Sequence, residues 1–171
     1  MNRMAAAAAL LAMAGAWAPS ALAGDACLVG SWTPVGNGAA EWVQRQAPGM
    51  KMMVQQQVAT MQLRGDGSYR LDAQVQAQAG HQGMGARSQG RFSASGQWSS
   101  RDGELTLVPV KSDMDASMVL SNGKDAAPAM KLPGGQARPT VHQYRCSGAD
   151  LETRMRIPGS KDPIVQRYRR Q

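Results

Sequence analysis

Apolar and polar residues alternate along much of the chain after residue 24. Between Tyr69 and Ala79 every second residue is apolar or small, and mostly polar residues, chiefly glutamines, stand between them. Shorter runs of the same kind cover 92–98 and 151–157. This period of two is typical of antiparallel strands with one face buried and the other in water. Turn signals rich in Gly, Asp, Asn and Ser separate the runs, at 65–68, 101–103, 121–123, 147–150 and 158–160.

The pattern predicts an all-β protein. Strands are expected over 28–33, 53–64, 68–79, 90–99, 103–110, 114–120, 140–147, 150–157 and 163–169. We expect an antiparallel up-and-down meander of eight to nine strands in one domain over 24–171, closed as a barrel or folded as a sandwich. A short N-terminal helix is expected within 38–50, around Ala39–Val43. Residues 80–89 and 121–139 alternate little and are expected to be loops, the second at a barrel mouth.

The first 23 residues have the features of a secretory signal peptide. Arg3 supplies the charged start, Met4–Ala18 is an unbroken run of apolar and small residues, and Ala21–Ala23 forms a small-x-small cleavage site. The apolar run is shorter than the about 20 residues that a membrane-spanning helix needs, so we do not expect a transmembrane protein. The segment predicts export to the periplasm or the medium, with cleavage near Ala23.

Two cysteines, Cys27 and Cys146, remain after that cleavage. Two cysteines in an oxidising compartment predict one disulfide. Its closure of a loop of about 120 residues would stabilise the fold by about 4–5 kcal/mol in the chain-entropy model. Lipidation of Cys27 is the alternative, but Asp25 fits a lipidation motif poorly.

Three sequence features together resemble the lipocalin-like proteins that bacteria secrete. They are Gly30-Ser31-Trp32 on the first expected strand, the hairpin turn at 67–69, and the arginine-bearing last strand over 165–169. The resemblance implies a lipocalin-like barrel with the Trp32 side chain at its closed end. It also implies that an arginine of the last strand, Arg167 or Arg169, packs across the Trp32 ring.

The candidate chemistry does not indicate an enzyme. His81 and His142 lie far apart with no acidic cluster beside them, and zinc needs three or four ligands. The chain carries no Gly-x-Ser-x-Gly motif, and a disulfide would occupy both cysteines. We therefore expect no catalytic residues, no metal and no cofactor.

Twelve methionines accompany one Phe and three Tyr, which favours methionine as core filler. A methionine-lined ligand cavity and a copper site remain alternatives.

Two functions are compatible with these features. The first is a non-enzymatic binding protein that holds a small apolar or amphipathic molecule inside the barrel. Face alternation selects its lining residues, which are Tyr69, Leu71, Val75, Phe92, Trp98 and Leu107.

The second function is that of an interaction protein, such as an inhibitor, an immunity factor or an envelope assembly partner. Its basis is the C-terminal stretch 138–171, where eight basic residues stand against three acidic ones. The partner surface would include Arg154, Arg156, Arg167 and Arg169, and export makes nucleic acid an unsuitable partner.

Overall fold

The computed structural model describes residues 24–81, 83–122 and 125–171. The predicted signal peptide lies outside these residues. The elements are β1 (Gly30–Val35), α1 (Gly38–Gln46), β2 (Lys51–Leu63), β3 (Ser68–His81), β4 (Met84–Arg101), β5 (Glu104–Asn122), β6 (Asp125–Ala126), β7 (Met130–Lys131), β8 (Thr140–Ser147), β9 (Asp150–Met155) and β10 (Ile164–Arg170).

Eight antiparallel strands close into a barrel. Their order around the barrel is β4-β3-β2-β1-β10-β9-β8-β5, and β5 pairs back to β4. The all-β, antiparallel, closed meander predicted from the sequence is thereby confirmed, as a barrel rather than a sandwich. Closure satisfies the backbone groups that an open sheet would leave at its edges.

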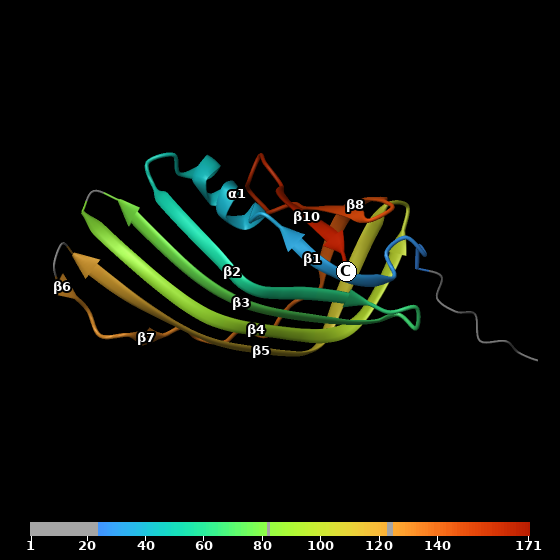
Figure 1. Cartoon of the computed structure of the whole chain (residues 1–171), viewed down its shortest axis with the longest axis horizontal. Coiled ribbons are helices and arrows are strands. Elements are labelled where there is room, and N and C mark those ends of the chain that lie inside the picture. The colour runs from blue at the N-terminus through green and yellow to red at the C-terminus, as the bar shows by residue number, and fades with distance from the viewer. Residues whose placement is uncertain (1–23, 82, 123–124) are drawn as a thin grey trace, which may run out of the picture.

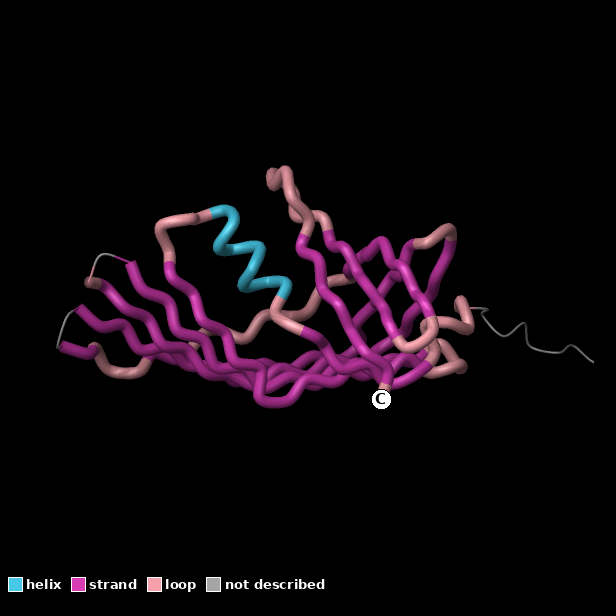
Figure 2. The backbone as a smooth tube through the Cα atoms, turned by 45° about the horizontal axis from the view of Figure 1, so that its top comes forward, coloured by secondary structure: helices cyan, strands magenta, loops and turns pink. Residues whose placement is uncertain are grey.

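Four of these strands are much longer than the rest. The strands β2, β3, β4 and β5 have 13, 14, 18 and 19 residues, whereas β1, β8, β9 and β10 have six to eight. The long strands continue past the barrel as a four-stranded sheet that curves toward the side on which α1 lies (Figures 1 and 2). We call this sheet the extension; it consists of 51–58, 74–81, 84–91 and 115–122. The two-residue strands β6 and β7 pair with the β5 edge of the extension.

The extension corrects two sequence predictions. Residues 80–89 were expected to be a loop, but β3 runs to His81 and β4 begins at Met84. The segments 103–110 and 114–120 were expected to be separate strands, but both belong to β5. The register shifts between Ser95 and Gly96 and leaves Val110 as an extra residue in β5. A bulge reverses the side on which the following residues point, which is why the alternation is broken there.

The core lies at one end of the barrel. The largest fully buried side chains are those of Trp32, Leu28, Leu63, Leu105 and Leu151. Tyr69, Ala94, Trp98 and Leu107 join the same cluster. These side chains come from β1, β2, β3, β4, β5 and β9 and from the segment before β1, so they link the strands around the circumference.

The helix α1 confirms the predicted short helix and bridges β10 and β2. Its N-cap is Asn37, whose Oδ1 accepts from the Ala40 amide at 3.0 Å. A Cβ at Gly38 would stand 1.9 Å from the Val165 carbonyl oxygen, so only glycine allows the helix to approach β10 this closely. Near the other end, Gln44 Nε2 donates to the Met52 carbonyl of β2 at 2.6 Å. Within the described residues, no helix is long and apolar enough to cross a membrane.

Candidate functional site

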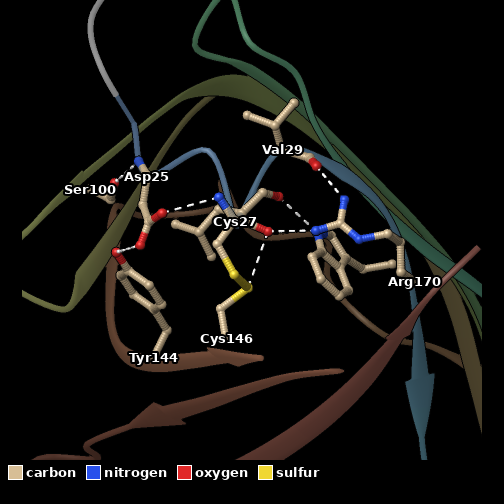
Figure 3. Close-up of a disulfide and its surroundings, with 9 residues drawn as sticks. Asp25, Cys27, Val29, Ser100, Tyr144, Cys146 and Arg170 are labelled. Carbon is tan, nitrogen blue, oxygen red and sulfur yellow. Dashed lines mark hydrogen bonds between the residues drawn. A yellow bond between two sulfur atoms is a disulfide. The ribbon is translucent and has the colours of Figure 1, made fainter. Parts of the chain in front are cut away.

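The segment before β1 seals one end of the barrel. Trp32 is fully buried, and its Nε1 donates to the Leu28 carbonyl at 2.8 Å. The Arg170 guanidinium carbon lies 4.3 Å from the centroid of the Trp32 ring. The same guanidinium donates to the carbonyls of Val29 at 2.5 Å and Cys27 at 2.6 Å (Figure 3). One side chain thus satisfies two backbone acceptors and covers the indole.

The predicted disulfide joins Cys27 to Cys146 and ties this segment to β8 (Figure 3). Asp25 adds a second tie, because its carboxylate accepts from the Cys27 amide at 3.0 Å and from the Tyr144 hydroxyl at 3.0 Å. The Asp25 amide donates to Ser100 Oγ at 2.7 Å. Residues 25–29 are thereby fixed to β4, β8 and β10. This end of the barrel is a closed structural plug.

The arginine over Trp32 is Arg170 and not Arg167 or Arg169, which corrects the prediction from the resemblance. Alternation explains the error, since Trp32 pairs with Arg170 in the β1–β10 register, and positions 167 and 169 face the opposite side. Their guanidinium groups lie outside, near Glu152 at 3.4 Å and Asp150 at 3.6 Å. Gly30 makes room for Arg170, because a Cβ there would stand 2.3 Å from Arg170 Nη1.

Acidic side chains pair with much of the predicted basic surface. Glu152 lies between two arginines, 2.8 Å from Arg154 and 3.4 Å from Arg167. The hydrogen bond from Arg154, with a smaller contribution from Arg167, lowers the pKa of the Glu152 carboxyl. Arg156 is exposed on the segment after β9. Ion pairs on a surface reduce the field that the arginines present to a partner.

Beyond the plug, the barrel interior holds an apolar cavity of about 210 Å³. Its lining comprises Met61, Tyr69, Leu71, Phe92, Ala94, Leu105, Leu107, Pro109, Ala137, Arg138, Thr140, His142, Thr153 and Tyr168. Four of the six predicted lining residues belong to this set: Tyr69, Leu71, Phe92 and Leu107. Trp98 instead packs in the core, where its Nε1 donates to the Arg64 carbonyl at 2.8 Å. Val75 lies on the extension, outside this cavity.

A few polar groups interrupt the apolar lining. The His142 Nε2 lies 2.9 Å from Thr140 Oγ1, and burial lowers the pKa of the His142 imidazole. Burial also raises the pKa of the Tyr168 hydroxyl, against the smaller opposite effect of a hydrogen bond with Thr153. Desolvation of both side chains favours their neutral forms at pH 7. Arg138 is the one charged side chain of the lining and is exposed, so the rest of the cavity suits an uncharged or apolar group.

Sequence reasoning missed the lining residues that precede and begin β8. Ala137 and Arg138 belong to the predicted loop 121–139, and the Ala137 amide is held by Ser112 Oγ at 3.0 Å. His142 and Thr140 alternate on β8, which could have indicated their common face. The loop residues that line the cavity show no alternation of apolar and polar positions, so the sequence did not indicate that they face the interior.

No family model, curated protein or solved structure matches this chain. The resemblance to lipocalin-like proteins therefore stays a prediction.

The extension carries an apolar face that continues the barrel interior. In the register of β3, β4 and β5, Leu71 shares its face with Ala94 and Ser112. Farther out, this face consists of Met52 and Val54 of β2, Ala73, Val75, Ala77 and Ala79 of β3, Ala86, Ser88, Gly90 and Phe92 of β4, and Met114, Ala116, Met118 and Leu120 of β5. We call this surface the trough. It lies on the concave side of the curved sheet (Figure 1).

The opposite face of the extension is mostly polar. It includes Gln74, Gln76 and Gln78 of β3, Arg87, Gln89 and Arg91 of β4, and Asp115 and Ser117 of β5, with Met53, Val58 and Val119 as its larger apolar residues. The described residues contain no group of three or more His, Cys, Asp or Glu side chains placed to hold a metal ion. The features that distinguish this molecule are therefore a plugged barrel, an apolar cavity and an apolar trough.

Proposed function

We propose that this protein is an exported, non-enzymatic binding protein that holds a compact apolar molecule, or the apolar part of an amphipathic one, in the barrel cavity. The observation that carries the proposal is the cavity of about 210 Å³ with its predominantly apolar lining. The disulfide between Cys27 and Cys146 supports export, since such bonds persist in oxidising compartments.

The size of the cavity limits the ligand. An apolar cavity of about 150 Å³ accepts benzene, whereas sites for drug-sized molecules measure about 300–1,000 Å³. A volume of about 210 Å³ therefore suits one or two fused rings, or a short stretch of aliphatic chain. The Tyr168 hydroxyl and the His142–Thr140 pair supply the few polar groups that would orient a ligand.

The rival function, an interaction protein that uses the basic C-terminal surface, has weaker support. Three of its four arginines have carboxylate partners, as described above for Arg154, Arg167 and Arg169. A partner would have to compete with Glu152 and Asp150 for these arginines. The cavity supports the binding function without any such competition.

The test is naphthalene binding, followed by the chemical shifts of methyl groups in the cavity. Ala94→Met would extend a side chain into the cavity, because Ala94 is buried and lines it. Ser95→Met is the matched control, since Ser95 points away from the cavity on the same strand. We expect naphthalene to bind the unmodified protein and Ser95→Met alike. Ala94→Met should weaken binding by about tenfold or more, which corresponds to about 1.4 kcal/mol.

Two results would overturn the proposal. One is absence of naphthalene binding to the unmodified, folded protein. The other is equal binding by the unmodified protein and Ala94→Met, which would place the bound probe outside the cavity.

A further inference from the structure

The trough has small side chains along its middle, which we call its floor, and larger side chains along both sides. The central strands β3 and β4 contribute mostly small side chains to the floor, such as Ala77, Ala79 and Ala86. The flanking strands contribute larger ones: Met52 and Val54 on β2, and Met114, Met118 and Leu120 on β5. Met130 of β7 is in register with Met118 and continues the β5 side of the trough. A floor of small residues between flexible thioethers leaves room for a long, thin apolar guest.

The trough is continuous with the barrel cavity. A second hollow of about 110 Å³ shares Met61, Leu71 and Tyr168 with the cavity, and Ala59 and Ala73 also line it. Ala73 is in register with Phe92 and Met114, which begin the trough, and Phe92 also lines the cavity. An apolar path therefore runs from the interior of the barrel onto the extension.

The length of this path fits one acyl chain. Ala73 and Ala79 are six residues apart on β3, which spans about 20 Å at the rise of an extended strand. One leaflet of a bilayer core is about 15 Å thick. An aliphatic chain can bend from the trough into the cavity, whereas a helix of a partner protein would have to end at the barrel mouth.

The far end of the extension has the chemistry of a membrane-binding tip. Met53 and Met84 are 63% and 60% exposed, and Leu120 is exposed at the same end. Met84 and Leu120 lie on the trough face there, and Met53 lies on the opposite face. Lys51 and Arg87 are exposed at the same end. Exposed apolar side chains flanked by cations bind to the surface of bilayers that contain anionic lipid.

From these observations we infer that the trough holds an acyl chain of a membrane lipid, taken up at the tip of the extension, with the end of the chain in the barrel cavity. This inference rests on the proposed function, because the cavity is the inner end of the path. The polar headgroup stays in water at the tip. Lys51 and Arg87 lie at this end on the opposite face of the sheet, where they attract the surface of an anionic membrane.

The experiment measures lipid uptake from vesicles of phosphatidylethanolamine and phosphatidylglycerol. The protein is incubated with the vesicles and separated from them, and native mass spectrometry counts the lipids that it retains. Ala77→Glu places a carboxylate on the trough floor, whereas Gln78→Glu places the same charge on the polar face one residue away. Ala79→Gln blocks the trough without adding a charge. Naphthalene binding is measured for every variant and reports on fold and cavity together.

We expect one retained lipid for the unmodified protein and for Gln78→Glu. Ala77→Glu and Ala79→Gln should retain about tenfold less lipid, because a polar group would be buried against the chain. Both should still bind naphthalene. Unchanged lipid retention in these two variants would overturn the inference that the trough binds an acyl chain. Absence of lipid from a protein that binds naphthalene would overturn it too. Neither result would contradict the proposed binding function of the cavity. Lipid retention without naphthalene binding would instead overturn the proposed function.

Discussion

Arg170, the penultimate residue of the chain, lies across the ring of Trp32, with its guanidinium carbon 4.3 Å from the ring centroid. The contact joins the last strand to the first and also fixes the segment that plugs the barrel. Its geometry depends on two further residues. Gly30 leaves space for the guanidinium, and the carbonyl of Cys27 accepts one of its hydrogen bonds. The plug is thus a joint product of both termini of the fold and the disulfide.

The structure of the plug predicts that replacing two neighbouring arginines will have very different effects on the free energy of unfolding. Arg170→Ala removes two charge-assisted hydrogen bonds and a cation–π contact, and should lower the free energy of unfolding by about 2–4 kcal/mol. Arg169→Ala removes an exposed ion pair at 3.6 Å from Asp150 and should change it by less than about 0.5 kcal/mol. Urea unfolding followed by tryptophan fluorescence measures both. Equal stabilities of the two variants would mean that Arg170 does not hold the plug.

The disulfide gives a second prediction. The Cys27–Cys146 bond spans 119 positions of sequence, so reduction should lower the free energy of unfolding by up to about 5 kcal/mol. Thiol labelling of the protein, purified under oxidising conditions and denatured without reductant, should detect no free cysteine. Labelling after reduction is the control and should detect two. Two reactive thiols without reductant would show that the protein lacks the bond.

The alternation of apolar and polar residues was sufficient to predict the barrel, but it did not predict the extension. Leu71 and Phe92 were placed in the interior because each lies on a regular strand with one apolar face. Val75 continues the same face, but the sequence does not show where the barrel ends and β3 continues alone. That boundary depends on β1, which pairs with β2 only over Gly30–Trp32. A strand pairing of this kind is a tertiary property and has no local signal.

The other errors have equally local causes. The extra residue Val110 broke the period of β5 and made one strand look like two. The predicted residues Arg169 and Arg167 are one and three positions from Arg170, and a shift by an odd number of residues reverses the face of a strand. Tyr168 is partly buried and packs against the core. Residues two apart on a strand point to the same side, so Arg170 faces inward as Tyr168 does.

His142 predicts a pH dependence of stability. Burial lowers the pKa of its imidazole below the ordinary value of 6.5, so the unfolded chain binds the proton more readily than the folded one. The contribution is fully present above pH 6.5 and is lost progressively as the pH falls below it, since the slope follows the difference in bound protons. Arg138 is the charged residue of the same cavity lining, and burial is the cause of the lowered pKa of His142.

Two histidine variants test this dependence between pH 7.5 and pH 5.5, a range that the carboxyl groups affect little. His142→Gln should flatten the decrease in unfolding free energy as the pH falls. His81→Gln is the control, because His81 is exposed near the far end of β3 and lies outside the cavity. An identical pH profile for His142→Gln and the unmodified protein would assign the dependence to other groups.

The two halves of β3 should differ in their protection from hydrogen exchange. Residues 69–73 lie in the barrel, where Tyr69 is buried in the core. Residues 75–81 lie in the extension, and none of them belongs to the buried core. Local opening requires less free energy where few apolar contacts are lost, so amides of 75–81 should exchange faster than those of 69–73.

Vesicle lipid should slow exchange in 75–81 and leave 69–73 nearly unchanged, because the acyl chain would cover the trough face of these residues. Ala77→Glu, which blocks the trough, should abolish that slowing, and Gln78→Glu should retain it. Uniform protection along β3 before lipid is added would mean that the extension is as stable as the barrel and needs no guest to cover it.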